Sequence, residues 1–505
     1  MHADRAFGAQ APRLRESNLV ETKQVFTCEV FMFQTEGTIQ RQLFAFTHRD
    51  LVATDSDVWL YADLFDQIDI EDFDADYVSQ GQSAKDPRLM LRTIFYGLTH
   101  GMVSGRKLGE ACRNDNRYVV LSGNTQPDGR TFQRFINRHD ERFSDLFVQV
   151  VRIATAMGLV KLGRVAIDGS RFRANTSKHK AMSYDRMKKA VDEITAELAV
   201  LKEQLAEENS STATDKEEDG RLPREIARRE DRLARIQAAK AALEAQAESG
   251  VPKDKAQKSF ADHDALLLGG KGEFIYGYNA QAAVDEHSQI IVAAHLHDCA
   301  ADSGALPGMI EAVKETCGQV PTAILADAGY MSAANVATSE SASIEPLIAV
   351  GKGETGTSVS VAEQLRPGDA PHEYFCPAGK QLPIKGRRSD GSTQLHPDGR
   401  FCNKCPMREG CRLHSKRGKT INVPPEPQRQ VLARHHARMR EEKAKEAYRR
   451  RKVICEPVFG NLKNKGLRIL VRGAKKVSTW WKIAATAHNI EKIVHRLPSA
   501  QLSPT

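Results

Sequence analysis

Three acidic residues of this 505-residue chain stand where folding could bring them together. Asp168 follows the apolar stretch 165–167, and Asp327 follows the apolar stretch 323–326, so each carboxylate comes where an expected β-strand pattern ends. Glu456 is a lone acid within a basic segment near the C-terminus. Three adjacent carboxylates can bind two Mg²⁺ or Mn²⁺ ions beside a phosphodiester, because these cations prefer oxygen ligands. We therefore hypothesise metal-dependent chemistry on a nucleic-acid backbone.

The charge pattern around Glu456 agrees with a polyanionic partner. The chain carries a net charge of +8, and the segment from Arg429 to Lys476 alone holds a larger excess of lysine and arginine over acidic residues. Such a concentration is typical of nucleic-acid-binding proteins. On charge alone, a solvated helix face explains it about equally well.

The same composition argues against other classes of protein. No apolar run is long enough to cross a membrane, and the N-terminus lacks a signal-peptide pattern, so we expect a cytoplasmic protein without a membrane partner. The nine cysteines are an odd number in a long chain without such a signal, which argues against a disulfide framework.

The order of the expected elements indicates how the two aspartates could be positioned. Three strands come first, followed by strands that alternate with helices, which is the order of an α/β, RNase H-like mixed sheet covered by helices. In such a sheet Asp168 belongs to the first strand and Asp327 ends the fourth. The expected elements are strands at 164–176, 274–285, 290–297, 323–327 and 345–350, with helices at 306–317 and 332–339.

Composition divides the chain into further parts. A helical domain at 56–155 exposes basic residues and could be a helix-turn-helix-like DNA reader or an ordinary bundle. These basic residues are Arg106, Lys107, Arg130, Arg134 and Arg138. The expected division is an N-terminal arm (1–55), this helical domain (56–155), the sheet domain (156–351 and 429–496), an inserted helical hairpin (182–250) and a Cys-containing insertion (352–428).

Four cysteines of the insertion could bind a structural zinc ion. Cys402 and Cys405 form a C-x2-C pair, and Cys376 and Cys411 lie at looser distances. Thiolates at this spacing can surround a tetrahedral ion, and His396 or His414 could replace one of them. Free cysteines in a loop-rich insertion are the alternative. The remaining cysteines, Cys28, Cys112, Cys299, Cys317 and Cys455, are expected to be ordinary thiols.

The basic segment around Glu456 is expected to be helical. Spacings of three, four and seven residues place several side chains near one stripe of that helix. They are Tyr448, Arg451 or Lys452, Glu456, Phe459 and Lys463. Pro457 predicts a kink or the start of a new helix, because proline lacks the backbone N–H. The last helix contains His488, which we expect to be structural.

Taken together, these motifs resemble the bacterial insertion-sequence transposases of the DDE, RNase H-like class, over most of the chain. The residues that carry the resemblance are Asp86-Pro-Arg-Leu-Met-Leu, Ile167-Asp-Gly-Ser170, Tyr278-Asn-Ala-Gln-Ala-Ala-Val-Asp285, Ala326-Asp-Ala-Gly-Tyr330 and Glu456-Pro-Val-Phe-Gly-Asn-Leu-Lys463.

The resemblance implies an acidic triad of Asp168, Asp327 and Glu456. It also implies a Tyr-Arg-Glu-Lys signature formed with Tyr448, Arg451 and Lys463. This chain has four residues between Arg451 and Glu456 where three are usual, so either Arg451 or Lys452 could contact the phosphate.

The implied activity is cleavage at the ends of a mobile element and strand transfer into target DNA. Its partner is double-stranded DNA, both terminal inverted repeats and target, bound by a homodimer. An inactive, transposase-derived DNA-binding protein is the alternative, and a nuclease that does not join strands is another. Asn279, Gln281 and Asp285 could line the site, but we expect them to close a hairpin turn. Asp302 is a further acid candidate, which we expect to cap a helix instead.

Overall fold

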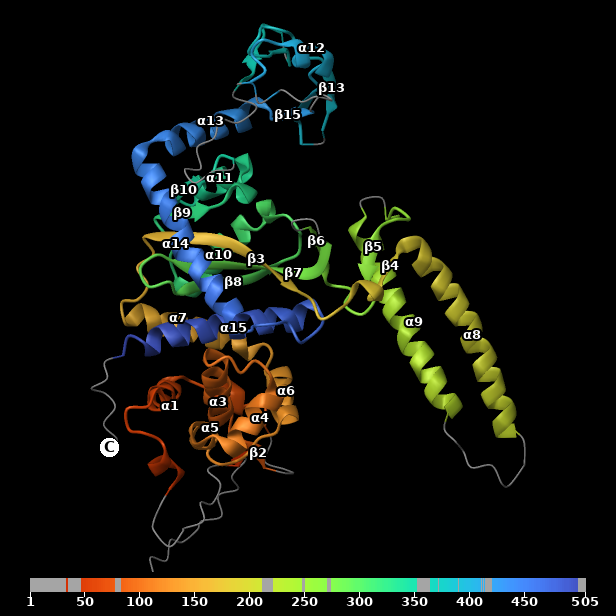
Figure 1. Ribbon diagram of the computed structural model, residues 1–505, viewed down its shortest axis with the longest axis vertical. Coiled ribbons are helices and arrows are strands. Elements are labelled where there is room, and N and C mark those ends of the chain that lie inside the picture. The colour runs from red at the N-terminus through yellow and green to blue at the C-terminus, as the bar shows by residue number, and fades with distance from the viewer. Residues whose placement is uncertain are drawn as a thin grey trace, which may run out of the picture.

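The computed structural model describes residues 33–34, 47–77, 83–210, 221–247, 250–269, 274–351, 364–370, 372–388, 390–409, 411, 413 and 420–497. Most of the expected N-terminal arm, together with Cys28 and His414, lies outside these ranges. Figure 1 shows an elongated molecule with a central sheet. The N-terminal helices lie at one end, the Cys-containing insertion at the other, and a helical hairpin projects to the side.

The central sheet is mixed, as predicted. Its strand order is β10-β9-β3-β7-β6, and β8 pairs with β7 along the same edge as β6. β3 is antiparallel to β7 and parallel to β9, which is parallel to β10. The strands are β3 (Arg164–Arg173), β6 (Leu266–Gly269), β7 (Phe274–Asp285), β8 (Ile291–His297), β9 (Ala323–Ala326) and β10 (Glu345–Ile348).

The central strands are buried on both faces, which explains their composition. Residues 165–167 of β3 and all four residues of β9 are buried and apolar, as expected for strands covered on both sides. The pattern changes at Asp168 in β3 and at Asp327 after β9, where polar side chains begin. The sheet therefore places its two carboxylates side by side, one within β3 and the other directly after the neighbouring strand β9.

The helices that cover the sheet come from three parts of the chain. They are α7 (Arg142–Ala156), α10 (Leu306–Cys317), α11 (Ala333–Ser341), α13 (Glu426–Arg440), α14 (Glu442–Asn464) and α15 (Ala474–Val494). Figure 1 shows α14 crossing the strands, with α7 and α15 side by side below them. Trp481 of α15 is fully buried and donates from Nε1 to the backbone oxygen of Gln281 in β7, at 2.9 Å.

Helix α14 contains Pro457 and is nevertheless one continuous helix of 23 residues, so the expectation that a new helix starts there was wrong. Proline cannot donate to the carbonyl four residues earlier, which belongs to Val453. The side chain of Gln289, from the β7–β8 turn, donates to that carbonyl oxygen at 2.9 Å. A distant residue thus satisfies the acceptor that Pro457 leaves open.

The N-terminal helices share one hydrophobic core with the sheet domain. As predicted, a helix begins at Pro87, and the Asp86 side chain accepts from the backbone N–H of Arg88. The elements are η1 (His48–Leu51), α1 (Asp57–Gln67), α2 (Glu71–Asp74), α3 (Pro87–Thr99), α4 (Gly105–Asn114), α5 (Asn116–Leu121) and α6 (Gly129–Arg138), with a short strand pair β1 (Phe33–Gln34) and β2 (Ala84–Lys85).

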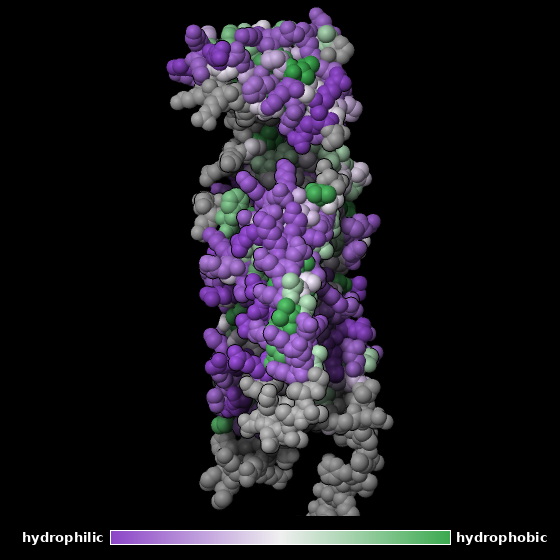
Figure 2. Space-filling model, turned by 90° about the vertical axis from the view of Figure 1, so that its right-hand side faces the viewer, coloured by the Kyte–Doolittle hydropathy of each residue, from purple (hydrophilic) through white to green (hydrophobic). Residues whose placement is uncertain are grey.

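Two long helices, α8 (Tyr184–Ser210) and α9 (Arg221–Gln246), pack against each other away from the sheet. Their contact is a separate small core that includes Ile194, Leu198 and Ile236. Between them and the sheet lie η2 (Lys178–Lys180) and the strand pair β4 (Ala181–Ser183) and β5 (Gln257–Ser259). Figure 2, which views the molecule from the side of this hairpin, shows a mostly hydrophilic surface.

The Cys-containing insertion has few regular elements and a small core of its own. Its elements are β11 (Arg366–Pro367), β12 (Tyr374–Phe375), β13 (Ile384–Arg387), β14 (Thr393–Leu395), α12 (Gly399–Lys404) and β15 (Ile421–Val423). Among the described residues of the whole chain, no helix has the length and apolar character needed to cross a membrane.

Candidate active site

Asp168 and Asp327 lie next to each other. Ile167 of β3 is paired with Ala326 of β9 in parallel register, so the residues that follow them are neighbours at the same end of the sheet. Burial raises the pKa of the Asp168 carboxyl, and the nearby charge of Asp327 raises it further. A pair of close carboxylates, one of them largely buried, favours a bound cation that offsets their repulsion.

In the described structure, Arg451 supplies the positive charge at Asp168. Its Nη1 donates to Asp168 Oδ2 at 2.9 Å, and the two side chains are only 12% and 20% exposed. This guanidinium opposes the effect of burial by lowering the pKa of Asp168. Arg451 Nε is buried without a hydrogen-bond partner among the described residues. Lys452 is exposed, so of the two candidate cations only Arg451 faces the aspartates.

Tyr448 lies one helical turn before Arg451, on the same face of α14. It is buried, and burial raises the pKa of its hydroxyl, which also senses the charges of Asp168 and Asp327. The predicted stripe therefore holds for Tyr448 and Arg451, which both face the carboxylates.

Glu456 is on α14 but is exposed. It comes five residues after Arg451, which corresponds to a rotation of roughly 140° around a helix. Cys455 lies between Arg451 and Glu456 in the chain and is fully buried. Its Sγ is 3.3 Å from the backbone oxygen of Ala166. Burial raises the pKa of this thiol, and the charges of Asp168 and Glu456 raise it further, so Glu456 lies at the margin of the site.

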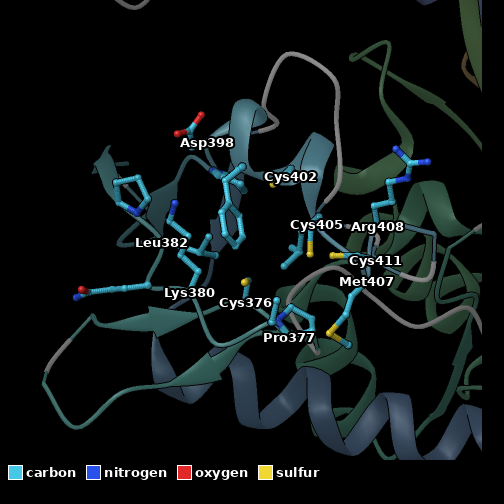
Figure 3. A pocket seen from close by; sticks show the side chains of 16 residues that line it. Cys376, Pro377, Lys380, Leu382, Asp398, Cys402, Cys405, Met407, Arg408 and Cys411 are labelled. Carbon is cyan, nitrogen blue, oxygen red and sulfur yellow. The ribbon is translucent and has the colours of Figure 1, made fainter.

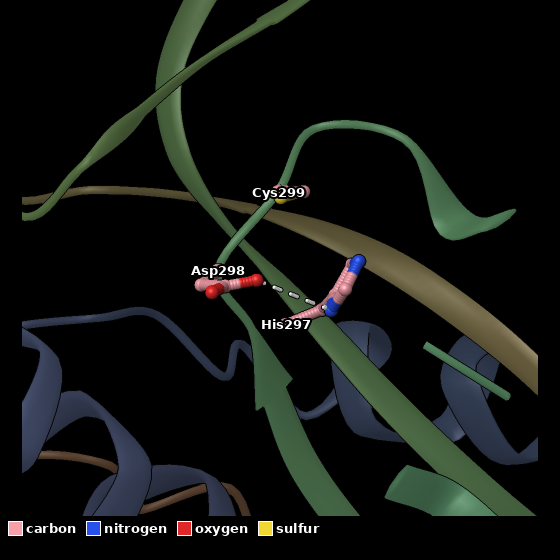
Figure 4. Close-up of side chains that lie close together, drawn as sticks. All are labelled: His297, Asp298 and Cys299. Atoms are coloured by element: carbon pink, nitrogen blue, oxygen red, sulfur yellow. Dashed lines mark ion pairs between the residues drawn. The ribbon is translucent and has the colours of Figure 1, made fainter. Parts of the chain in front are cut away.

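The structure thus brings together two of the three predicted acids. Within the described ranges, the ligand atoms of Asp168, Asp327 and Glu456 do not all lie within 4.8 Å of one another. Among the residues that the structure describes, the one group of three that meets this distance is His297, Asp298 and Cys299, at the end of β8 (Figure 4). These residues are consecutive and two of them are exposed, which gives no enclosed site, and we assign them no role.

Lys463 is exposed and is the last but one residue of α14. Its Nζ lies 5.7 Å from the ring centre of Phe172, which packs edge-on against Trp480. The five predicted basic residues of α4 and α6 are also exposed. The two helices touch at their starts, since a Cβ on Gly129 would lie 2.9 Å from the backbone of Arg106, so these basic side chains share one region of the surface.

A largely buried polar group lies next to the aspartates, although the sequence analysis favoured other roles for its residues. Asn279 and Gln281 were expected to close a hairpin turn, which is wrong: both lie inside β7 and are buried. Their amides donate to Asp302 Oδ1 at 2.8 and 2.9 Å. Asp302 is the first residue of the short helix η3 (Asp302–Gly304), whose N-cap is Ala301, so Asp302 is not a helix cap.

Asp285 does close the β7–β8 turn, as expected, by accepting from the backbone N–H of His287 at 2.9 Å. A signal for the other two residues was present in the sequence. Asn279 and Gln281 are polar positions two residues apart in an otherwise apolar strand, so they share a face of the sheet.

The four cysteines of the insertion line one small pocket (Figure 3). Burial raises the pKa of the Cys402 thiol, and so does the proximity of Cys411, Cys376 and Cys405, in that order. No three of their sulfurs lie within 4.8 Å of one another. His396 Nδ1 is 3.4 Å from the Thr420 hydroxyl.

Comparison with known families identifies two separate segments. The model described as "Transposase DDE domain" matches residues 375–494, which include Tyr448, Arg451 and Glu456. The model described as "Transposase domain (DUF772)" matches residues 46–138, the N-terminal helices. No curated protein and no solved structure matches the chain.

Proposed function

We propose that this chain cuts DNA at the ends of its element and joins the freed 3′-hydroxyl to target DNA. Its two domain matches support an insertion-sequence transposase of the DDE class. The observation that carries this proposal is the juxtaposition of Asp168 and Asp327 under a helix that presents Arg451. The strand order and directions described above support an RNase H-like sheet, in which neighbouring strands carry the reacting carboxylates.

Divalent metals are general in this family, and Asp168 and Asp327 fit such an ion. Their oxygens are hard ligands. Burial and the charge of Asp327 both disfavour the ionised form of Asp168 and raise its pKa, and a bound cation would offset this effect. Asp168 and Asp327 would hold Mg²⁺ or Mn²⁺, with Glu456 as the third acid. When bound, the ions would activate the attacking oxygen and stabilise the leaving oxygen of an in-line displacement.

The chain's own residues supply the remaining steps. Arg451 neutralises Asp168 before DNA arrives and is available to pair with a phosphate once a cation replaces it, because guanidinium groups bind phosphate well. Lys452 and Lys463 on the exposed side of α14, and Tyr448 at the site, would contact the DNA backbone. The basic side chains of α4 and α6 would hold the terminal inverted repeats. Cutting two element ends together requires a homodimer on DNA.

The test is cleavage of DNA that carries the element's terminal repeats, with the full chain and Mg²⁺. Asp168→Asn, Asp327→Asn and Glu456→Gln should each lower cleavage at least a thousandfold while DNA binding is retained, since each removes a metal ligand. Glu442→Gln, an exposed acid of the same helix, is the matched control for Glu456. Normal cleavage by Asp168→Asn would refute the proposal.

The products separate the alternatives. Cleavage with joined products supports transposition, whereas cleavage without joining indicates a nuclease of the same fold. DNA binding without cleavage under any divalent metal indicates an inactive, transposase-derived DNA-binding protein.

The four cysteines around one pocket would hold a structural zinc ion, drawing the sulfurs together. The insertion has a small core of its own, and parts of this size commonly need a metal for stability. Purified protein should contain about one zinc per chain by mass spectrometry. Cys402→Ser and Cys405→Ser should lose it, whereas Cys317→Ser, outside the insertion, should not. Equal zinc content in all variants would contradict this assignment.

A further inference from the structure

The buried side chains of Asn279, Gln281 and Tyr330 and the half-buried side chain of Asp302 form one hydrogen-bonded group behind the two aspartates. Asp302 Oδ1 accepts from both amides, and Gln281 Nε2 also lies 2.9 Å from Asn279 Oδ1. Gln281 Oε1 in turn accepts from the Tyr330 hydroxyl. Asp302 is the one carboxylate among these four residues, so its hydrogen bonds are charge-assisted and stronger than neutral ones.

This group contacts the backbone directly after Asp168. A Cβ on Gly169 would lie 2.4 Å from Gln281 Nε2 and 3.0 Å from Asp302 Oδ1. Gly169 pairs with Gln281 across the sheet, while Asp168 pairs with Ala282, so the Asp168 side chain points to the opposite face. The group therefore lies behind the strand that presents Asp168 to Arg451.

The same group reaches the segment after Asp327. The Cβ position over Gly329 lies 3.5 Å from Asp302 Oδ2 and 2.9 Å from Asp327 Oδ1. Asn335 joins the two segments, because its amide donates to the backbone oxygens of Ser303 and Tyr330 at 2.7 and 2.6 Å. Asp302 thus lies between the two chain segments that carry the aspartates.

We propose that Asp302 is a positioning residue, which sets the separation of Asp168 and Asp327 through Gly169 on one side and Gly329 on the other. This role rests on the proposed metal-dependent cleavage. Metal ligation tolerates only small displacements of its carboxylates, so their backbones need rigid support. Asp302 supplies it from the opposite face of the sheet without contacting the DNA.

The first experiment measures cleavage by the full chain against Mg²⁺ concentration. Asp302→Asn should raise the Mg²⁺ concentration for half-maximal cleavage, or lower the maximal rate, by about 10- to 100-fold, the usual effect of losing a residue that orients metal ligands. Mn²⁺ should restore part of the rate, because it generally binds oxygen and nitrogen ligands without the strict geometry that Mg²⁺ demands. Asp298→Asn, in the same loop and 90% exposed, is the matched control and should behave as the unaltered chain.

A charge swap distinguishes positioning from folding. Gln281→Glu alone places two carboxylates together and should lower cleavage as Asp302→Asn does. Combined, the two substitutions exchange donor and acceptor and should recover about tenfold of the lost activity, as expected for residues in direct contact. Tyr330→Phe, which removes one neutral hydrogen bond, should reduce cleavage only about two- to tenfold.

The outcomes separate the two proposals. If Asp302→Asn cleaves with normal Mg²⁺ dependence while Asp168→Asn is inactive, the positioning role is wrong and the proposed function stands. If Asp168→Asn is active, the proposed function itself fails. A loss in Asp302→Asn that neither Mn²⁺ nor the swap recovers, with metal-free DNA binding also lost, means that Asp302 serves only folding and overturns the inference.

Discussion

Gly169→Ala is a sharp perturbation of the candidate site because it adds one methyl group where no space exists. The new Cβ would lie 2.4 Å from Gln281 Nε2 and 3.0 Å from both Asn279 Oδ1 and Asp302 Oδ1. Overpacking a buried position by this amount costs about 1–3 kcal/mol. An alanine gains only about 0.4–1 kcal/mol by restricting the unfolded chain, so the variant should be less stable than the unaltered protein.

Gly308→Ala is the matched control. Gly308 lies in α10, and a Cβ there meets nothing within 4 Å, so the substitution should stabilise the protein by about 0.5–1 kcal/mol. Urea unfolding should measure both changes. The two variants should also differ in cleavage, since displacing Gln281 and Asp302 moves the backbone that carries Asp168.

Equal stability and equal cleavage in the two variants would refute the close packing inferred at Gly169. A stability loss without any change in Mg²⁺ dependence would retain the packing argument. It would remove the link from Gly169 to the positions of the carboxylates.

Two further predictions concern titration. Arg451→Gln removes a charge that lowers the pKa of Asp168, so that pKa should rise. Because cleavage needs the carboxylate ionised, the fall in cleavage rate on acidification should begin at a higher pH in a pH–rate profile. An unmoved acid limb of that profile would contradict the role of the ion pair. Burial lowers the pKa of His488 from 6.5 to about 4, so the unfolded chain binds more protons between these values and stability present above pH 6.5 is lost as the pH falls through that range. His488→Gln, which can still donate to the backbone oxygen of Gln289, should be spared about 1.5 kcal/mol of the loss between pH 6.5 and 5 in chemical unfolding. An unchanged pH dependence would show that His488 is not buried in its neutral form.

Periodicity in the sequence was enough to predict five strands of the central sheet, whereas β6 (Leu266–Gly269) was not predicted. Strands that are buried on both faces read as short apolar runs, and Asp168 and Asp327 mark where those runs stop. Parallel pairing of β3 with β9 then makes the two aspartates neighbours, because each directly follows one residue of the pair Ile167 and Ala326. This part of the site needed no knowledge of side-chain packing.

The helix that carries Glu456 shows where spacing alone is insufficient. Spacing placed Tyr448, Arg451 or Lys452, and Glu456 near one stripe of the helix, and only packing decides which of them face the sheet. The structure turns Tyr448, Arg451 and Cys455 toward the sheet and leaves Glu456 exposed. Likewise, Pro457 stays inside the helix because Gln289 covers the carbonyl of Val453.

The sequence by itself determined which strands carry Asp168 and Asp327 and that a basic helix accompanies them, because these features depend on local patterns of apolar and charged residues. The tertiary structure alone decided that Arg451 pairs with Asp168 and that Asp302 lies behind both aspartates. Those contacts join residues far apart in the chain, and hydrogen bonds of this kind depend on distances of a few tenths of an ångström that no local pattern encodes.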